Sequence, residues 1–127
     1  MRIVNQFSVL FLLLSFSLFS CESNPPPGMT DPGELIYHGY VNKHAQCSRC
    51  HGEHGQGGMF GPKIRGAVQK LGADSVRAII SDGKGKGEQR MPGLAKELTS
   101  LQIEQVIRFL QRWDEPQPLD SSSMNED

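Results

Sequence analysis

Three residues in one short stretch of the sequence could carry chemistry together. Cys47, Cys50 and His51 stand in the run Cys47-Ser48-Arg49-Cys50-His51, which is a C-x-x-C-H motif. This motif is the signature of covalent haem attachment, in which two thiols add across the porphyrin vinyl groups and the adjacent histidine binds the iron. The short spacing holds the histidine under the iron without a long loop to order. The motif therefore predicts one covalently bound haem c, with His51 as an axial ligand.

Three other uses of the two thiols are weaker interpretations. A thioredoxin-like redox pair also has C-x-x-C spacing, but that fold needs a βαβ pattern, which the sequence lacks. A zinc site could combine Cys47 and Cys50 with two of His44, His51 and His54, although exported thiols tend to oxidise and no second ligand pair stands at a finger-like distance. A disulfide between such close neighbours would close a small and weakly stabilising loop.

Met91 is predicted to be the second axial ligand of the iron. It stands in a polar, glycine-rich loop, far enough beyond His51 for the chain to reach the opposite face of the macrocycle, and Pro92-Gly93 suits a tight turn. Met59 follows His51 too closely for an easy path around the haem. The other candidates for this position are Met29, Met124, His38, His44 and His54.

The N-terminal residues have the pattern of an export signal followed by a tether. Arg2 precedes an apolar stretch over residues 7–19, so residues 1–20 are expected to form a signal peptide. Cys21 directly after a small residue resembles the lipobox of bacterial lipoproteins, which implies that its thiol carries a lipid. Residues 21–30 are rich in proline and are expected to form an extended membrane tether. The predicted location is therefore exported: a membrane-anchored lipoprotein facing the bacterial periplasm.

Length and composition leave room for one small domain. The chain has 127 residues, of which 37% are hydrophobic and 21% charged, which excludes a polytopic membrane protein and a two-domain enzyme. The 13 basic and 14 acidic residues nearly balance, so nothing suggests a nucleic-acid partner. Residues 114–127 contain acidic residues, prolines and serines but no basic residue, and are expected to form a disordered acidic tail. The foldable part is then 31–113.

Helix signals dominate the foldable part, and no segment alternates with the period of a strand. Asp31, Pro32 and Glu34 predict the start of a helix that runs to about residue 46. Asp74 can cap a short second helix that Gly83 stops. The apolar residues expected on one side of that second helix are Val76, Ile79 and Ile80.

The last helix has the clearest pattern. Thr99 and Gln102 form a capping box, and Leu98 and Ile103 can pack across it. One face of this helix carries Ile103, Val106, Ile107, Leu110 and Trp113. Glycine-rich loops over residues 52–73 and 83–98 complete a domain with few large apolar side chains, and a domain this small usually needs a cofactor, metal or disulfide.

The order of these features resembles class I monohaem cytochrome c. That order is a helix, C-x-x-C-H-G, Gly61-Pro62, a short helix, Met91-Pro92-Gly93 and a terminal amphipathic helix ending in aromatic residues. The resemblance covers about 31–113. It implies a small all-α fold of three to four helices and glycine-rich loops wrapped around one covalently attached haem, with Met91 as the second iron ligand.

The resemblance also implies roles for residues outside the motif. The carbonyl of Pro62 would accept a hydrogen bond from the second ring nitrogen of His51, which fixes the orientation of the ligand. Gly39 would lie where the first and last helices cross, opposite Phe109 or Leu110. Arg65 is a candidate to neutralise a haem propionate, or is a solvated surface side chain.

The sequence departs from the family pattern at one position. The family commonly carries an aromatic residue four positions before the first cysteine of the motif, and this chain has Lys43 there. Tyr40 or Tyr37 is expected to supply the missing aromatic packing.

An iron with both axial positions taken by protein leaves no vacancy for a substrate, so the predicted function is one-electron transfer rather than catalysis. The expected partners are membrane-bound redox proteins, with no nucleic acid and no small-molecule substrate. Two alternatives stay open: a fixed haem c subunit of a larger redox enzyme or oxidase, and a zinc-stabilised interaction module. Residues 60–96 hold eight basic and three acidic residues, which suggests a cationic rim that steers an anionic partner.

Overall fold

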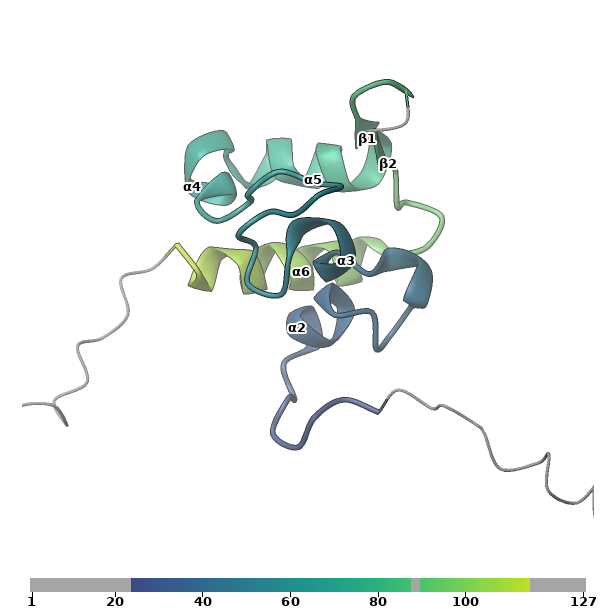
Figure 1. Ribbon diagram of the computed structural model, residues 1–127, viewed down its shortest axis with the longest axis vertical. Coiled ribbons are helices and arrows are strands. Elements are labelled where there is room, and N and C mark those ends of the chain that lie inside the picture. The colour runs from purple at the N-terminus through teal and green to yellow at the C-terminus, as the bar shows by residue number, and fades with distance from the viewer. Residues whose placement is uncertain (1–23, 88–89, 115–127) are drawn as a thin grey trace, which may run out of the picture.

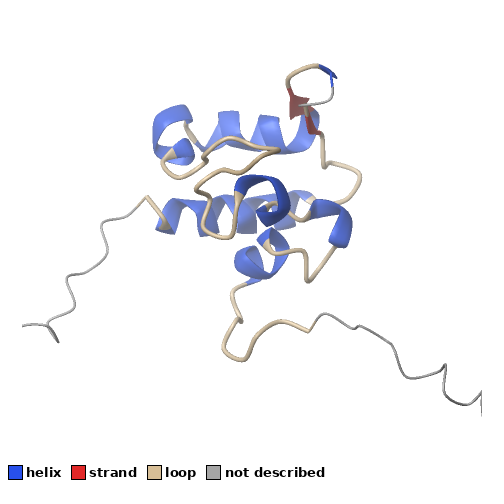
Figure 2. Ribbon diagram, viewed as in Figure 1, coloured by secondary structure: helices blue, strands red, loops and turns tan. Residues whose placement is uncertain are grey.

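The structure is a computed structural model that describes residues 24–87 and 90–114. Five α-helices lie within these residues, in the order α2 (Pro32–Tyr37), α3 (Ser48–His51), α4 (Ala67–Leu71), α5 (Ala73–Asp82) and α6 (Ser100–Arg112). The 3₁₀ turn η1 (Lys43–Ala45) precedes α3, and the short strands β1 (Gly83–Lys84) and β2 (Met91–Pro92) pair antiparallel. In the ribbon views α6 runs across the middle, with α5 above it and α2 below it (Figures 1 and 2). The predicted all-α fold is confirmed.

The last helix forms as its sequence predicts. The Thr99 hydroxyl accepts a hydrogen bond from the Gln102 backbone N–H, and the Gln102 side chain accepts one from the Thr99 N–H, so the capping box is present. Leu98 and Ile103 are both buried at this end. The buried face of α6 is apolar and consists of Ile103, Val106, Ile107, Phe109 and Leu110. Helices α2, α4 and α5 pack against α6.

Helix α2 crosses α6 at Gly33, and the prediction that Gly39 lies at this crossing is wrong. A Cβ atom on Gly33 would meet the Gln105 carbonyl oxygen and lie 2.7 Å from the Cβ of Phe109. Gly39 instead faces the side chain of Gln46, with a left-handed φ of 80°. The two backbones therefore approach closely only because residue 33 has no side chain.

An ion pair fixes the beginning of α2 against the end of α6. The Asp31 side chain caps α2 by accepting from the Glu34 N–H at 2.9 Å, and its other oxygen lies 2.8 Å from the Arg112 guanidinium. Burial acts to raise the pKa of Asp31, but these hydrogen bonds and the Arg112 charge outweigh it and the pKa is lowered. The predicted cap is confirmed, and the same Asp31 side chain also links α2 to α6 through Arg112.

The first helix is shorter than predicted. It ends at Tyr37 rather than near residue 46, because the chain turns at Gly39, whose N–H donates to the Ile36 carbonyl while the Tyr40 N–H donates to that of Leu35. The Asn42 side chain then caps η1 by accepting from the His44 N–H at 2.9 Å. The helix therefore starts where its local capping signal predicts, and the left-handed turn at Gly39 sets its end.

Both segments expected to be loops contain regular structure. Helix α4 lies inside 52–73, and the strands β1 and β2 lie inside 83–98. Asp114, which the sequence places in the acidic tail, accepts hydrogen bonds from the N–H groups of Gly66 and Gln69 at the start of α4. A long-range contact therefore supplies the cap that the local sequence of α4 lacks.

The middle helix α5 ends at Asp82, just before Gly83 as predicted, but Asp74 is not its N-cap. Its N-cap position is Gly72, and Asp74 lies in the first turn, where it pairs with Arg77. Arg77 also pairs with Glu104 of α6, so the charges join the two helices at the surface. Val76 and Ile80 are buried, and Ile79 is half-buried.

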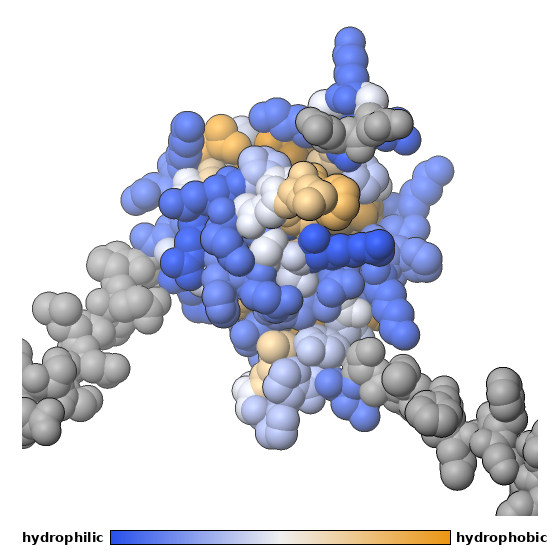
Figure 3. All heavy atoms as spheres, in the orientation of Figure 1, coloured by the Kyte–Doolittle hydropathy of each residue, from blue (hydrophilic) through white to orange (hydrophobic). Residues whose placement is uncertain are grey.

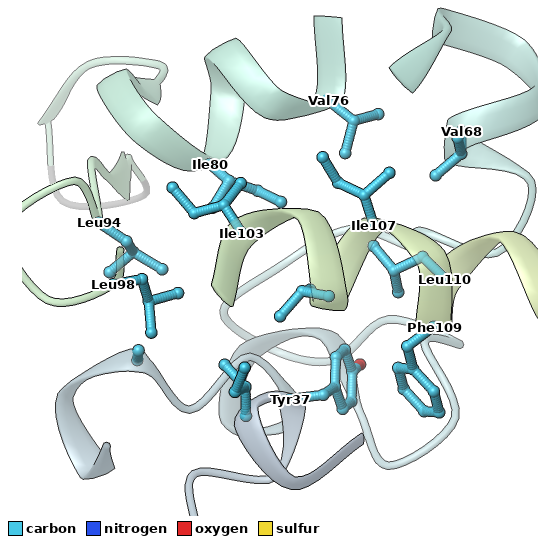
Figure 4. Packing of buried hydrophobic residues seen from close by; sticks show 13 residues of the cluster. Tyr37, Val68, Val76, Ile80, Leu94, Leu98, Ile103, Ile107, Phe109 and Leu110 are labelled. Carbon is cyan, nitrogen blue, oxygen red and sulfur yellow. The ribbon is translucent and has the colours of Figure 1, made fainter. Parts of the chain in front are cut away.

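The core is a single layer of aliphatic side chains between α5 and α6 that continues into an aromatic cluster beside α2. In the close-up, Val76 and Ile80 point toward Ile103 and Ile107, while Tyr37 and Phe109 lie together on the other side of α6 (Figure 4). Tyr37 is fully buried, and its ring centroid lies 5.1 Å from that of Trp113. Of the two tyrosines considered, Tyr37 supplies the aromatic packing.

Several predictions fall outside the described residues. They are the signal peptide over residues 1–20, lipidation of Cys21, and the tail beyond residue 114. Within the ranges that the structure describes, no helix is long and apolar enough to cross a membrane.

We expect Gly33→Ala to destabilise the protein, because the added methyl group would overlap the backbone of α6. Overpacking of this kind costs roughly 1–3 kcal/mol of unfolding free energy, measured by denaturant titration of the purified protein. Leu101→Ala, at a position of α6 that is 64% exposed, is the control and should change that free energy by less than about 0.5 kcal/mol. Equal effects of the two substitutions would contradict the close crossing at Gly33.

Candidate functional site

One turn of helix brings the three motif residues together. Cys47 has helical backbone angles, and its carbonyl accepts hydrogen bonds from the N–H groups of Cys50 and His51 at 3.1 and 3.0 Å. Gly52 ends the turn with a φ of 82°, where its N–H donates to the Ser48 carbonyl. The i, i+3 and i+4 spacing places both thiols and the imidazole on one side of the turn.

The environment of Cys47 does not favour a redox-active thiolate. Cys47 and Cys50 are not joined to each other by a disulfide. Burial raises the pKa of the Cys47 thiol to about 12. A thiolate is the reactive form in thiol–disulfide exchange, so this thiol is poorly suited to the thioredoxin-like chemistry considered from the sequence.

The imidazole of His51 is held by the loop that follows it in the sequence. It is buried, and its Nδ1 atom lies 2.8 Å from the Pro62 carbonyl oxygen. Gly61 lies against the ring, where a Cβ atom would be 2.9 Å from Nδ1. A ring nitrogen that donates to a carbonyl leaves Nε2 free to bind a metal, and this arrangement orients many metal-bound histidines. The contact that the family resemblance implied for Pro62 is therefore present in the structure.

Tyr37 of α2 is hydrogen-bonded to the end of the same turn, a role that the sequence did not reveal. Its hydroxyl donates a 2.6 Å hydrogen bond to the Gly52 carbonyl, and burial raises the pKa of this hydroxyl. Satisfying a carbonyl at the end of α3 anchors the motif to α2. The sequence indicates that an aromatic residue is needed near the motif, because Lys43 replaces the usual one. The hydrogen bond from Tyr37 to Gly52 joins residues 15 apart and could not be predicted from a local pattern.

Two adjoining cavities lie beside the motif. Their volumes are about 340 and about 350 Å³, within the range of small-molecule sites. Four residues line both of them: Cys47, His51, Pro62 and Met91. The first cavity also contacts Cys50, and the second extends between α4, α5 and α6 along apolar side chains that include Val76, Ile80, Val106 and Leu110.

Met91 reaches the cavities from the β-ladder. It stands opposite Lys84 in the antiparallel pair, and the ladder is tight because a Cβ atom on Gly83 would come within 2.7 Å of the Gly93 nitrogen. Met91 is half-buried and packs against the core. The structure thus places the thioether residue and His51 on separate elements that face the same two cavities.

The competing candidates for the second axial position are arranged differently. Met59 is 88% exposed, and neither Met59 nor Met29 lines a cavity. The His38 side chain pairs with Glu53 at 3.1 Å. His54 lines neither cavity, and His44 lines only the first. Met124 lies outside the described residues. Axial ligation by Met91 stays a prediction, and Met91 is the candidate that shares both cavities with His51.

The donor set and the cavity walls fit a haem. Two thiols, one oriented imidazole and one thioether surround apolar walls of the kind that enclose a porphyrin. Within the part of the chain that the structure describes, no three His, Cys, Asp or Glu side chains come together in a group that could hold a metal ion. The zinc site that sequence analysis kept open is therefore not assembled there.

Arg65 lies away from the cavities. Its Nε donates to the His54 carbonyl at 2.7 Å, and its guanidinium stacks over the Trp113 ring at 5.7 Å. Arg65 lines neither cavity. The interpretation of Arg65 as a propionate partner is therefore not supported by its position, because its side chain is already engaged by the loop after the motif and the end of α6.

Comparisons with known proteins agree with this site. The family described as cytochrome c oxidase, cbb3-type, subunit III matches residues 33–110. Among solved structures, the c-type cytochrome XoxG from Methylobacterium extorquens AM1 matches with a TM-score of 0.50 and 25% sequence identity. That match covers 63% of this chain and 50% of the XoxG chain. The comparison with curated proteins gives no match.

The family match has the site at its centre. It begins inside α2, includes the whole C-x-x-C-H turn and the Met91 loop, and ends near the last turn of α6. These are the elements that surround the two cavities. Because the match extends over more than half of the sequence, this chain belongs to the cytochrome c family and carries covalently bound haem c, for which Cys47 and Cys50 form a fitting attachment site.

Proposed function

We propose that the chain is a one-electron carrier in which His51 and Met91 bind the haem iron on its two faces. The observation that carries this proposal is that both residues, from α3 and β2, line the same two cavities beside the attachment cysteines. When bound, haem c supplies one-electron exchange between ferric and ferrous iron. The Pro62 carbonyl fixes the imidazole of His51, and the β-ladder fixes Met91.

The protein residues favour transfer over catalysis. Two axial protein ligands leave no position on the iron for a substrate, and a thioether ligand favours the ferrous state. The apolar walls from α5 and α6 exclude water, which limits the reorganisation that accompanies a change of charge. We therefore assign no catalytic residue to the described chain.

The proposed setting is a membrane surface that faces the bacterial periplasm. The support is the sequence pattern of residues 1–30, in which an export signal precedes Cys21 and a proline-rich tether. A lipid on Cys21 would confine the domain to the membrane surface and raise its effective concentration near membrane-bound donor and acceptor complexes.

A second candidate function is a fixed haem subunit of an oxidase. The observation that favours it is the description of the matching family as a subunit of a cbb3-type oxidase. Purification of the full chain from its native membrane separates the two functions. We expect a mobile carrier to elute without a stoichiometric partner after mild detergent extraction, whereas a one-to-one complex with a catalytic subunit would favour the oxidase role.

The first cavity opens within an apolar and cationic surface. Phe60 lines it and is 70% exposed, and the neighbouring Met59 is also exposed. Lys43, Arg49 and Arg90 line the same cavity, and no carboxylate of the described residues does so. The space-filling view shows apolar atoms near the middle of one face, surrounded by hydrophilic side chains (Figure 3). We name Phe60 and these three cations the docking face and propose that it meets an anionic redox partner.

The docking face replaces part of the cationic rim expected from the sequence. Lys63, Lys84 and Arg90 of that rim line a cavity. Arg77 lines neither cavity and instead pairs with Asp74 and Glu104. Lys43 and Arg49, from before and within the motif, join instead.

Met91→Ala tests the axial ligation. The variant should lose the weak far-red sulfur-to-iron absorption band and bind carbon monoxide in the ferrous state, because the thioether is gone and one axial position is open. Met59→Ala is the matched control and should keep the band, since Met59 lines neither cavity. Survival of the band in Met91→Ala would show that another residue binds the iron.

Ionic strength tests the docking face. Electron transfer to ferricyanide, an anion, should slow as salt rises, and transfer to a tris-phenanthroline cobalt(III) cation should become faster, because salt screens attraction and repulsion alike. Lys43→Gln with Arg90→Gln should weaken both trends, and Lys70→Gln, which lines neither cavity, should not. Stopped-flow rates that do not change with salt for either reagent would remove electrostatic steering.

A further inference from the structure

The two cavities differ in which attachment cysteines line them. The vinyl carbons that react with cysteine and the two propionate groups stand on opposite edges of the porphyrin. Cys50 lines only the first cavity, and Cys47 lines both. A haem attached through both cysteines would have its thioether edge at the first cavity, and its opposite edge would extend toward the second.

Two cations border the second cavity. Lys63 and Lys84 are the charged residues that line it in the described part of the chain, and both side chains are exposed. The other lining residues, apart from Tyr37, are aliphatic side chains, Met91, His51, Pro62 and small residues. The Tyr37 hydroxyl already donates to the Gly52 carbonyl. Two carboxylates entering this apolar space need cationic partners, because an unpaired buried charge is costly.

We propose that Lys63 and Lys84 bind the two haem propionates, an inference that rests on the proposed haem-binding function. Each lysine comes from a different wall, Lys63 from the loop after Pro62 and Lys84 from β1. Their ammonium groups offer charge-assisted hydrogen bonds to carboxylates.

Both lysines are built into the parts of the fold that hold the axial residues. Lys63 follows Pro62, whose carbonyl contacts His51. Lys84 stands opposite Met91 in the β-ladder. The loop at Pro62 thus contacts His51 and carries Lys63, and the β-ladder carries both Met91 and Lys84.

The other cations near the site are placed for different roles. Lys43, Arg49 and Arg90 line the first cavity together with Cys50, at the thioether edge. Arg65 is held by the His54 carbonyl and the Trp113 ring. This assignment replaces Arg65 with two lysines as the propionate partners.

The test compares reduction potentials of the haem-loaded protein and its charge variants. Lys63→Gln, Lys84→Gln and the double variant are measured by redox titration at low ionic strength, with Lys70→Gln as the control because Lys70 lines neither cavity. Loss of positive charge beside the haem favours the oxidised state. We expect the double variant to shift the equilibrium by roughly tenfold, which is about 59 mV for one electron, and the control to match the parent protein.

A pH profile identifies the propionates as the groups concerned. Removing a neighbouring cation raises the pKa of a carboxylic acid, so the potential of the double variant should fall with rising pH over a range where that of the parent is constant. Lys63→Arg with Lys84→Arg should restore the parent profile, since arginine keeps the charge and also binds carboxylates.

The outcomes separate this inference from the function on which it rests. A coloured double variant with the far-red band, the potential and the pH profile of the parent would overturn the lysine assignment and leave the carrier function intact. A parent protein that loses all colour on acid–acetone extraction would instead overturn covalent haem attachment. A potential shift of the same size in Lys70→Gln would show a general charge effect and would also contradict the specific assignment.

Discussion

The apolar walls around the two cavities must be kept out of water, and side chains alone do not do so. Val76, Ile80, Val106 and Leu110 belong to the core and also line the second cavity, so one layer of side chains serves both. A domain of this size buries little apolar surface, so leaving these walls in contact with water would lower its free energy of unfolding substantially. A haem attached through Cys47 and Cys50 is therefore part of the core of this protein as well as its working group.

Backbone carbonyls give the site its geometry. The Pro62 carbonyl orients His51, and the Gly52 carbonyl accepts from Tyr37, so both ends of the loop after the motif are tied down. Tyr37 in turn packs against Phe109 and Trp113 of the last helix. The crossing at Gly33 brings α2 close enough to α6 for these contacts, which means that a glycine distant from the motif helps to fix the imidazole.

Charge is distributed unevenly around the haem site. Cations line both cavities, and no carboxylate of the described residues lines either one. Four carboxylates are engaged elsewhere: Asp31 with Arg112, Asp74 and Glu104 with Arg77, and Asp114 with the start of α4. Asp114 is the first residue of the acidic C-terminal segment, and its hydrogen bonds to Gly66 and Gln69 make it part of the fold. The cavity walls of the described chain are therefore cationic where they are charged, which suits the proposed anionic partner.

The sequence by itself determined the local features of this protein. The C-x-x-C-H spacing specified the haem attachment site, the capping box at Thr99 and Gln102 specified α6, and Asp31-Pro32 specified the start of α2, because each depends on residues within one or two helical turns. Only the tertiary structure decided which glycine lies at the helix crossing, that Asp114 caps α4, that Tyr37 supports the motif, and that Lys63 and Lys84 rather than Arg65 border the second cavity. Those contacts join residues far apart in the chain, and the energy that selects them comes from packing around a shared core, which no local pattern records.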